Sequence, residues 1–237
     1  MTAEQLLKRL ARVAAERYRP AGRTACYFAR GKLRRDPVFA ALLARGLIPE
    51  GARLLDLGCG QGLLAAWLDA ASAMHRGGQW PESWPPPPRL SAFRGIELMP
   101  RYVERARRAL GALAQIECAD IRSAAYGAAD VVVVLDVLHY LDPSAQAQVL
   151  QRVRASIGSA GTLLLRVGNA AGGWRFSLSR WVDAAVLYLR GNRHRRLYCR
   201  TLPAWSAILE SSGFTARAIP MSAGTPFANV LLVATPQ

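Results

Sequence analysis

The residues best suited to chemistry are three closely spaced glycines that follow a buried acid. Residues 54–57 form an apolar run that contains Asp56, and Gly58, Gly60 and Gly62 come directly after it. An apolar helical pattern then begins at once. Glycine lets the backbone turn sharply and lets a ligand approach the main-chain N–H groups closely. The stretch therefore predicts a buried strand, a tight binding turn and a helix N-terminus.

The position of the acid indicates which ligand this turn would hold. The dinucleotide-binding fingerprint has a wider spacing between its second and third glycines, so the stretch is not that motif. Asp56 lies inside the end of the predicted strand. A carboxylate there suits a cationic or hydroxyl-bearing ligand better than a pyrophosphate.

Three more acids stand at the ends of later predicted strands: Glu97 at the end of 91–98, Asp120 after 114–118, and Asp136 after 130–135. In open α/β sheets the ligand binds outside the carboxyl ends of the strands, at the switch point beside the first strand. We therefore expect these acids and Asp56 to converge on one site.

The elements that would position these residues alternate between strand and helix, which predicts parallel βαβ units and a three-layer α/β fold. The apolar run from Val131 to Leu135 is typical of a central parallel strand that is buried on both faces. We expect helices at 100–110, 143–157 and 203–212, with Gly158 ending the second of them. Further strands are expected at 162–167, 214–220 and 229–234.

Two segments interrupt this alternation. Residues 72–90 contain Gly77, Gly78 and four consecutive prolines, which cannot lie in a helix or a central strand, so we expect a surface loop with polyproline II character. Residues 169–200 form an insertion after the fifth strand. Its apolar residues recur at helical spacing, which predicts a helix: Trp174, Leu178, Trp181, Ala185 and Tyr188.

The positive charge of the chain is concentrated in two segments. The 237 residues have a formal net charge of +15. Residues 1–50 hold 11 basic and 4 acidic residues, and residues 166–200 hold 8 basic and 1 acidic, so each segment contributes +7. We interpret residues 1–50 as a basic helical cap before the main domain, 51–237. The concentration suggests a local cause, such as an anionic partner (a membrane surface or an acidic carrier protein), and an ordinary solvated surface remains the alternative.

The cysteines and the hydropathy pattern limit the class of protein. Four widely spaced cysteines without a CxxC pair argue against a zinc site or a disulfide framework and fit a reducing cytosol. No signal-peptide pattern and no apolar run of the ~18 residues that a membrane span needs is present. We expect a cytoplasmic protein, with peripheral association with the inner membrane as an option, and no bound metal.

The glycine motif of residues 55–62, followed by acids after the second, third and fourth strands, resembles that of the class I S-adenosylmethionine-dependent methyltransferases. The resemblance runs from about Leu54 to Val233. It implies a Rossmann-like, mostly parallel sheet of seven strands in the order 3-2-1-4-5-7-6. It also implies S-adenosyl-L-methionine as cofactor and S-adenosyl-L-homocysteine as product. Two short blocks, 172–176 and 224–230, are also similar to bacterial methyltransferases of aryl polyene-type pigment pathways.

The resemblance also implies roles for individual residues. Gly58, Cys59 and Gly60 would line the methionine part of the cofactor, with Asp56 near its ammonium group and Asp136 under the methionine end. Glu97 would bind both ribose hydroxyls, because a carboxylate is a good bidentate acceptor. Leu98 and Met99 would pack on the adenine, whose edge Asp120 and Ile121 would contact. The alternative for each acid is a strand-end or capping role.

Methyl transfer from a sulfonium is an in-line displacement, so the enzyme must mainly align the acceptor with the methyl group and exclude water. A general base is needed only for a weakly acidic acceptor. His139 is the candidate base and Tyr140 a second candidate for contact with the substrate, although structural packing is the favoured interpretation of the segment 138–141.

We expect the acceptor to be a small molecule that is aromatic, lipid-like or carrier-bound, and the sequence does not decide between O-, N- and C-methylation. The charge also supports an RNA methyltransferase. Against RNA, no RNA-binding module and no Asn-Pro-Pro-Tyr-type motif after the fourth strand is present. A third hypothesis is a scaffold protein that binds the cofactor without catalysing a reaction.

Overall fold

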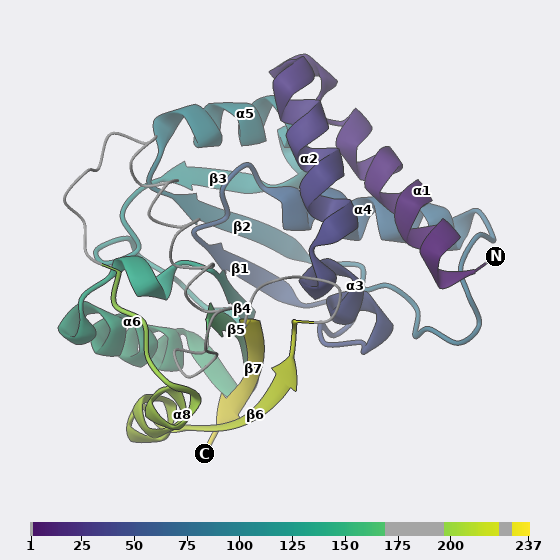
Figure 1. Cartoon of the computed structure of the whole chain (residues 1–237). Coiled ribbons are helices and arrows are strands. Elements are labelled where there is room, and N and C mark those ends of the chain that lie inside the picture. Colours follow the sequence, from purple (N-terminus) through teal and green to yellow (C-terminus); the bar gives the residue numbers. More distant parts are fainter. Residues whose placement is uncertain (1, 169–196, 223–228) are drawn as a thin grey trace. The chain divides into compact units, whose positions relative to one another are not determined.

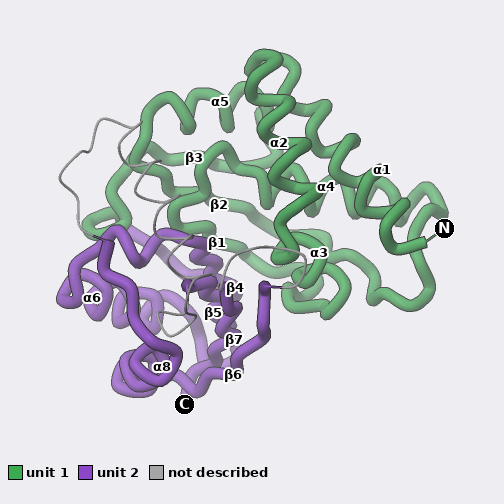
Figure 2. The backbone as a smooth tube through the Cα atoms, viewed as in Figure 1, with its two compact units in different colours: residues 1–124 green, residues 125–237 purple. Residues whose placement is uncertain are grey.

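The computed structural model describes residues 2–168, 197–222 and 229–237. The chain divides into two compact units, residues 1–124 and 125–237 (Figure 2). The elements of the first unit are α1 (Ala3–Glu16), η1 (Arg19–Ala21), α2 (Arg23–Arg35), α3 (Pro37–Ala44), β1 (Arg53–Leu57), α4 (Leu63–Arg76), β2 (Ala92–Glu97), α5 (Pro100–Leu110), η2 (Gly111–Leu113) and β3 (Gln115–Cys118). Those of the second unit are β4 (Ala129–Leu135), η3 (Leu138–Tyr140), α6 (Pro143–Ser156), β5 (Ile157–Gly168), α8 (Leu202–Ser211), β6 (Phe214–Pro220) and β7 (Asn229–Pro236).

The strands form one sheet of seven in the order β3-β2-β1-β4-β5-β7-β6 (Figure 1). β2 is parallel to β1 and β3, and β5 is parallel to β4. β7 runs antiparallel to both β5 and β6. The predicted fold class, including the strand order and the reversed C-terminal strand, is confirmed.

The N-terminal region folds as the predicted helices. α1 begins with a capping box, in which the Thr2 hydroxyl accepts from the Gln5 N–H at 3.2 Å and the Gln5 side chain accepts from the Thr2 N–H at 3.0 Å. Leu6, Leu10 and Ala14 recur at helical spacing and are fully buried. This stripe packs α1 against α2 and α4, and α1 and α2 lie side by side in Figure 1.

In the second unit β4 is buried along its whole centre, as predicted. The boundary between α6 and β5 differs from the prediction. We expected the helix to end at Gly158 and the strand to begin at 162, but α6 ends at Ser156 and β5 begins at Ile157. Ile157 already has extended backbone angles, so the chain passes from helix to strand without a loop, and Gly158 lies in the strand.

The proline-rich loop starts later than predicted, because α4 continues to Arg76. The loop is not a free excursion. Pro87 and Pro88 are buried, and the Trp80 indole N–H donates to the Pro85 carbonyl at 2.9 Å. The predicted helical insertion lies almost entirely outside the described residues, as do most residues of the two blocks similar to pigment-pathway enzymes.

Candidate cofactor site

The loop between β1 and α4 is built on three glycines with left-handed backbone angles. Gly58, Gly60 and Gly62 have φ of 74°, 58° and 72°. Only glycine adopts this conformation without a Cβ penalty. A Cβ at Gly62 would lie 2.5 Å from the Leu110 side chain, whereas a Cβ at Gly60 would meet nothing within 4 Å. The backbone angles of the loop therefore require glycine at these three positions. At Gly60, open space also remains beside the main chain.

Glu97, at the end of β2, holds this loop from one side. The Gly60 N–H donates to its Oε2 and the Met99 N–H donates to its Oε1, both at 2.9 Å. The Gly58 N–H donates to the Ile96 carbonyl at 2.8 Å. Each carboxylate oxygen of Glu97 still has a second lone pair, so this carboxylate can accept from a ligand as well. The support that Glu97 gives the loop was not predicted from the sequence.

Asp56 lies near the end of β1 and is only 4% exposed. Its carboxylate makes no ion pair within the described part of the chain. Burial, and then the negative charge of Glu97, raise the pKa of Asp56 from 3.8 to about 7. A buried carboxylate with a raised pKa gains most from a cationic ligand, because an opposite charge would offset its desolvation.

Two residues of this site, Gln61 and Tyr18, were not predicted from the sequence to take part in it. The Gln61 side chain is buried, and its Oε1 has no hydrogen-bond partner among the described residues. The Gln61 carbonyl accepts a hydrogen bond at 2.8 Å from the hydroxyl of Tyr18, which follows α1. The only sequence signals were the place of Gln61 between two motif glycines and that of Tyr18 at the end of the apolar stripe of α1.

Cys59 contributes to the loop through its backbone. Its side chain packs against β2, where a Cβ at Gly95 would lie 2.6 Å from the Cys59 sulfur. Burial, followed by the charges of Asp56 and Glu97, raises the pKa of the thiol well above its usual range. The thiol is therefore a neutral packing group beneath the loop.

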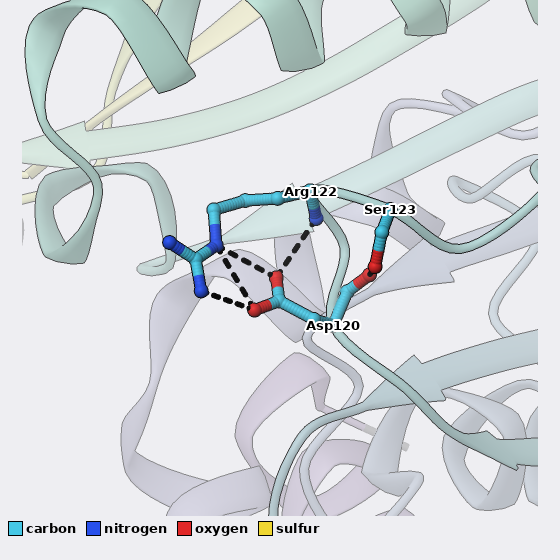
Figure 3. A network of polar contacts seen from close by, with 3 residues as sticks. All are labelled: Asp120, Arg122 and Ser123. Atoms are coloured by element: carbon cyan, nitrogen blue, oxygen red, sulfur yellow. Dashed lines mark hydrogen bonds and ion pairs between the residues drawn. The ribbon is translucent and has the colours of Figure 1, made fainter.

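The predicted adenine-contacting residues follow β2 and β3. The Ala119 N–H donates to the Glu97 carbonyl at 3.0 Å, which joins the ends of the two strands. Leu98 is 47% exposed beside Glu97, whereas Ile121 is buried. The Asp120 carboxylate is engaged by Arg122, whose backbone N–H donates to Oδ1 and whose Nε donates to Oδ2, both at 2.9 Å (Figure 3).

In the second unit, Asp136 follows β4 and pairs with a buried arginine. Arg166 is 2% exposed, and its Nε donates to Asp136 Oδ1 at 2.8 Å. Among the described residues, Asp136 is the one non-glycine residue with a positive φ, 59°. Strained backbone of this kind clusters at functional sites and persists where its surroundings hold it in place.

His139, the predicted base, lies in η3 and is 9% exposed. Its ring packs on that of Tyr140, with the ring centroids 4.2 Å apart, and its carbonyl accepts from the Tyr198 N–H at 2.8 Å. The buried Gln146 amide ties this turn together by donating to the carbonyls of Leu138, Leu141 and Tyr198. These contacts are those of a packed structural turn.

Two properties of the described residues bear on ligands and membranes. Within residues 2–168, 197–222 and 229–237, no group of three or more histidine, cysteine or acidic side chains is placed to hold a metal ion. No described helix is long and apolar enough to cross a bilayer.

Three solved structures share the fold at low sequence identity. The mitomycin 7-O-methyltransferase MmcR is 22% identical, with a TM-score of 0.62, over 100% of this chain and 61% of that one. The magnesium protoporphyrin IX methyltransferase from Synechocystis PCC 6803, solved with S-adenosylhomocysteine, is 19% identical, with a TM-score of 0.59, over 98% of this chain and 99% of that one. An O-methyltransferase from neocarzinostatin biosynthesis, solved with S-adenosylmethionine and a naphthoic acid, is 20% identical, with a TM-score of 0.59, over 90% of this chain and 57% of that one.

A curated relative matches a shorter part of the chain. The carboxy-S-adenosyl-L-methionine synthase of Chromohalobacter salexigens is 31% identical in an alignment 134 positions long, which covers 51% of this chain and 43% of that protein. The alignment thus spans less than half the length of this relative. A family model described as a methyltransferase domain matches residues 27–219. The chain therefore belongs to the methyltransferase-domain family, and this match together with the strand order confirms the resemblance to the class I S-adenosylmethionine-dependent methyltransferases.

Proposed function

We propose that the protein transfers the methyl group of S-adenosyl-L-methionine to a small-molecule acceptor and that the loop between β1 and α4 holds the cofactor. The observation that carries the site assignment is Asp56, a buried carboxylate without an ion-pair partner in the described part of the chain, next to a loop of left-handed glycines. The cofactor has a sulfonium and an ammonium group. Either of these cationic groups would offset the desolvation of the Asp56 carboxylate.

Other residues of the first unit fit the remaining parts of the cofactor. Glu97 is held by two backbone N–H groups and offers its other lone pairs to the ribose hydroxyls. Leu98 presents an exposed apolar side chain for the adenine. Open space at Gly60 allows close approach to the main chain. In this proposal the Asp120 carboxylate lies at the adenine edge and accepts from the ligand as well as from Arg122. Ile121 packs beneath the adenine.

In the second unit, Asp136 is the candidate for the methionine end of the cofactor. Its pairing with Arg166 fixes the carboxylate in one orientation. The tight packing of His139 favours a structural role over that of a general base, so alignment of the acceptor and exclusion of water carry the reaction. This scheme suits an acceptor that is already ionised near neutral pH, such as a carboxylic acid.

The comparisons support a small-molecule acceptor over RNA. The similar structures are those of a mitomycin 7-O-methyltransferase, a magnesium protoporphyrin IX methyltransferase and an O-methyltransferase in complex with a naphthoic acid. The deciding assay supplies methyl-labelled cofactor to extract separated into small molecules, lipids, carrier-bound metabolites and RNA. Label found in RNA alone would contradict the proposal.

The cofactor site is tested by titrating S-adenosylhomocysteine into wild-type protein and Glu97→Ala in a calorimeter. We expect affinity to fall by about 100-fold or more, because the variant loses the proposed ribose acceptor and the support of Gly60. Glu104→Ala is the matched control, since Glu104 lies on the exposed side of α5 and pairs with Arg108 of the same helix. Unchanged affinity in Glu97→Ala would overturn the site assignment.

A charged face of α2 supports a second part of the proposal, an acidic protein partner such as a carrier that presents the acceptor. Tyr27 and Phe28 are 66% and 49% exposed and lie among exposed arginines: Arg23, Arg30, Arg34 and Arg35. The helix has no acidic residue. Its aliphatic residues are buried within the unit, so it lacks the broad apolar face that a bilayer-binding helix needs. Aromatic residues and arginine are instead enriched at protein interfaces.

The partner proposal is tested with Arg30→Glu/Arg34→Glu and, as control, Arg101→Glu on α5. An acidic carrier protein should bind the wild type and the control with an affinity that falls as salt rises, and should not bind the double variant. Binding of the wild type to vesicles of anionic phospholipid but not to the carrier would favour a membrane instead.

A further inference from the structure

The cofactor loop is joined to the N-terminal helices by one buried side chain. Tyr18 is fully buried, and its hydroxyl donates to the Gln61 carbonyl at 2.8 Å, across 43 residues of sequence. Gln61 lies between Gly60 and Gly62, the two glycines at which the loop turns into α4. The contact therefore lies next to Gly60, where a Cβ would meet nothing within 4 Å.

This hydrogen bond complements the one made by Glu97. Glu97 accepts from the N–H of Gly60, so the two sides of the same turn are held by groups from different elements. A buried carbonyl without a donor is costly, so the Gln61 peptide prefers the orientation in which its carbonyl accepts from Tyr18. Burial raises the pKa of the Tyr18 phenol, which keeps the hydroxyl protonated and able to donate.

The N-terminal helices in turn hold Tyr18 in place. The Tyr18 N–H donates to the Ala15 carbonyl at 3.0 Å, so the residue continues the last turn of α1. The preceding residue, Arg17, donates through Nε to Asp69 of α4 at 2.9 Å. Tyr18 is thus anchored to α1 through its own backbone and to α4 through its neighbour Arg17.

We propose that Tyr18 is a positioning residue for the cofactor loop, so that the packing of α1 and the affinity for the cofactor are coupled. The inference rests on the proposed function of this loop. It assigns the N-terminal helices a role in cofactor binding, although α1 lies outside the region that the family model matches. A ligand that orders the loop would stabilise α1, and loosening of α1 would weaken the ligand by the same factor.

The first test compares Tyr18→Phe with the wild type in calorimetric titrations with S-adenosylhomocysteine. We expect affinity about 5- to 20-fold weaker, because the ligand must then restore a loop orientation that the free protein no longer maintains. Glu104→Gln is the control. It removes the exposed ion pair with Arg108 on α5, which takes no part in holding Tyr18 or the loop, so its affinity should stay within twofold of the wild type.

The second test begins with the wild type, whose response to the ligand does not depend on the folding of a variant. Hydrogen exchange of α1 amides is measured with and without S-adenosylhomocysteine. We expect the ligand to slow exchange in α1, and expect this effect to be lost in Tyr18→Phe. A merely structural Tyr18 would change the basal exchange rate but not the response to the ligand.

The outcomes separate this inference from the proposed function. Loss of binding in Glu97→Ala, together with wild-type affinity in Tyr18→Phe or no slowing of α1 exchange in the wild type, would overturn the coupling alone. No binding of S-adenosylhomocysteine by the wild type would overturn the proposed cofactor site itself.

Discussion

The Glu97 carboxylate accepts a hydrogen bond from the Gly60 N–H at 2.9 Å, so the residue proposed to bind the ribose also supports the glycine loop. Its second oxygen accepts from the Met99 N–H. Glu97→Gln places an amide NH₂ where one of these N–H groups needs an acceptor. We expect a loss of about 1–3 kcal/mol in the free energy of unfolding, measured with urea. Glu117→Gln, on the partly exposed strand β3, should cost less than about 1 kcal/mol and is the control.

The glycines of the loop should respond differently to alanine. Gly62→Ala combines a positive φ with a Cβ only 2.5 Å from Leu110, so we expect it to lose well over 2 kcal/mol of stability. Gly60→Ala has the same backbone penalty, about 1–2 kcal/mol, but meets nothing within 4 Å. It should fold and yet bind S-adenosylhomocysteine at least tenfold more weakly. Equal losses of stability in the two variants would contradict this difference.

The raised pKa of Asp56 predicts how stability depends on pH. The folded protein binds a proton at Asp56 up to pH about 7, whereas the unfolded chain releases it near 3.8. Between these values the folded state holds more protons than the unfolded state, so stability falls as pH rises from about 4 to 7. Urea unfolding at several pH values should show this slope in the wild type. Asp56→Asn should lack the Asp56 contribution, and an identical slope in that variant would contradict the assignment.

The same carboxylate predicts a pH dependence of cofactor affinity. A cation beside Asp56 lowers the pKa of that group, so binding near pH 7 releases a proton. Affinity for S-adenosylmethionine should therefore increase as pH rises from 6 to 8. Calorimetry in two buffers of different ionisation enthalpy measures the released proton directly. Asp56→Asn should bind more weakly and release fewer protons, and proton uptake by the wild type would contradict the role of Asp56.

The contribution of the Asp136–Arg166 ion pair to stability can be measured separately from the cost of the positive φ at Asp136. Asn tolerates left-handed angles, so Asp136→Asn removes the charge with little change in strain. It removes the carboxylate to which Arg166 donates, which costs about 1–3 kcal/mol. Asp142→Asn is the control, because Asn caps a helix as well as Asp does and α6 should keep its cap. Thermal and urea unfolding measure both variants.

Local patterns determined much of this protein. The apolar run of β4 and the glycines after Asp56 specify a buried strand and a turn without reference to the rest of the chain. The strand order and the reversed β7 came from the resemblance, because strand pairing is not encoded in periodicity. Errors fell at the ends of elements: Gly158 resembles a helix end, but direct passage of α6 into β5 placed it in a strand.

Side-chain partners were decided by the tertiary structure. The sequence marked Glu97 and Asp120 alike as acids at strand ends, yet one supports the loop while the other binds Arg122. Nothing in the sequence joined Tyr18 to Gln61, since their contact depends on how α1 packs against α4. Periodicity records which residues are buried within an element. The identity of the group that satisfies a buried polar atom depends on the packing of elements that are distant in sequence.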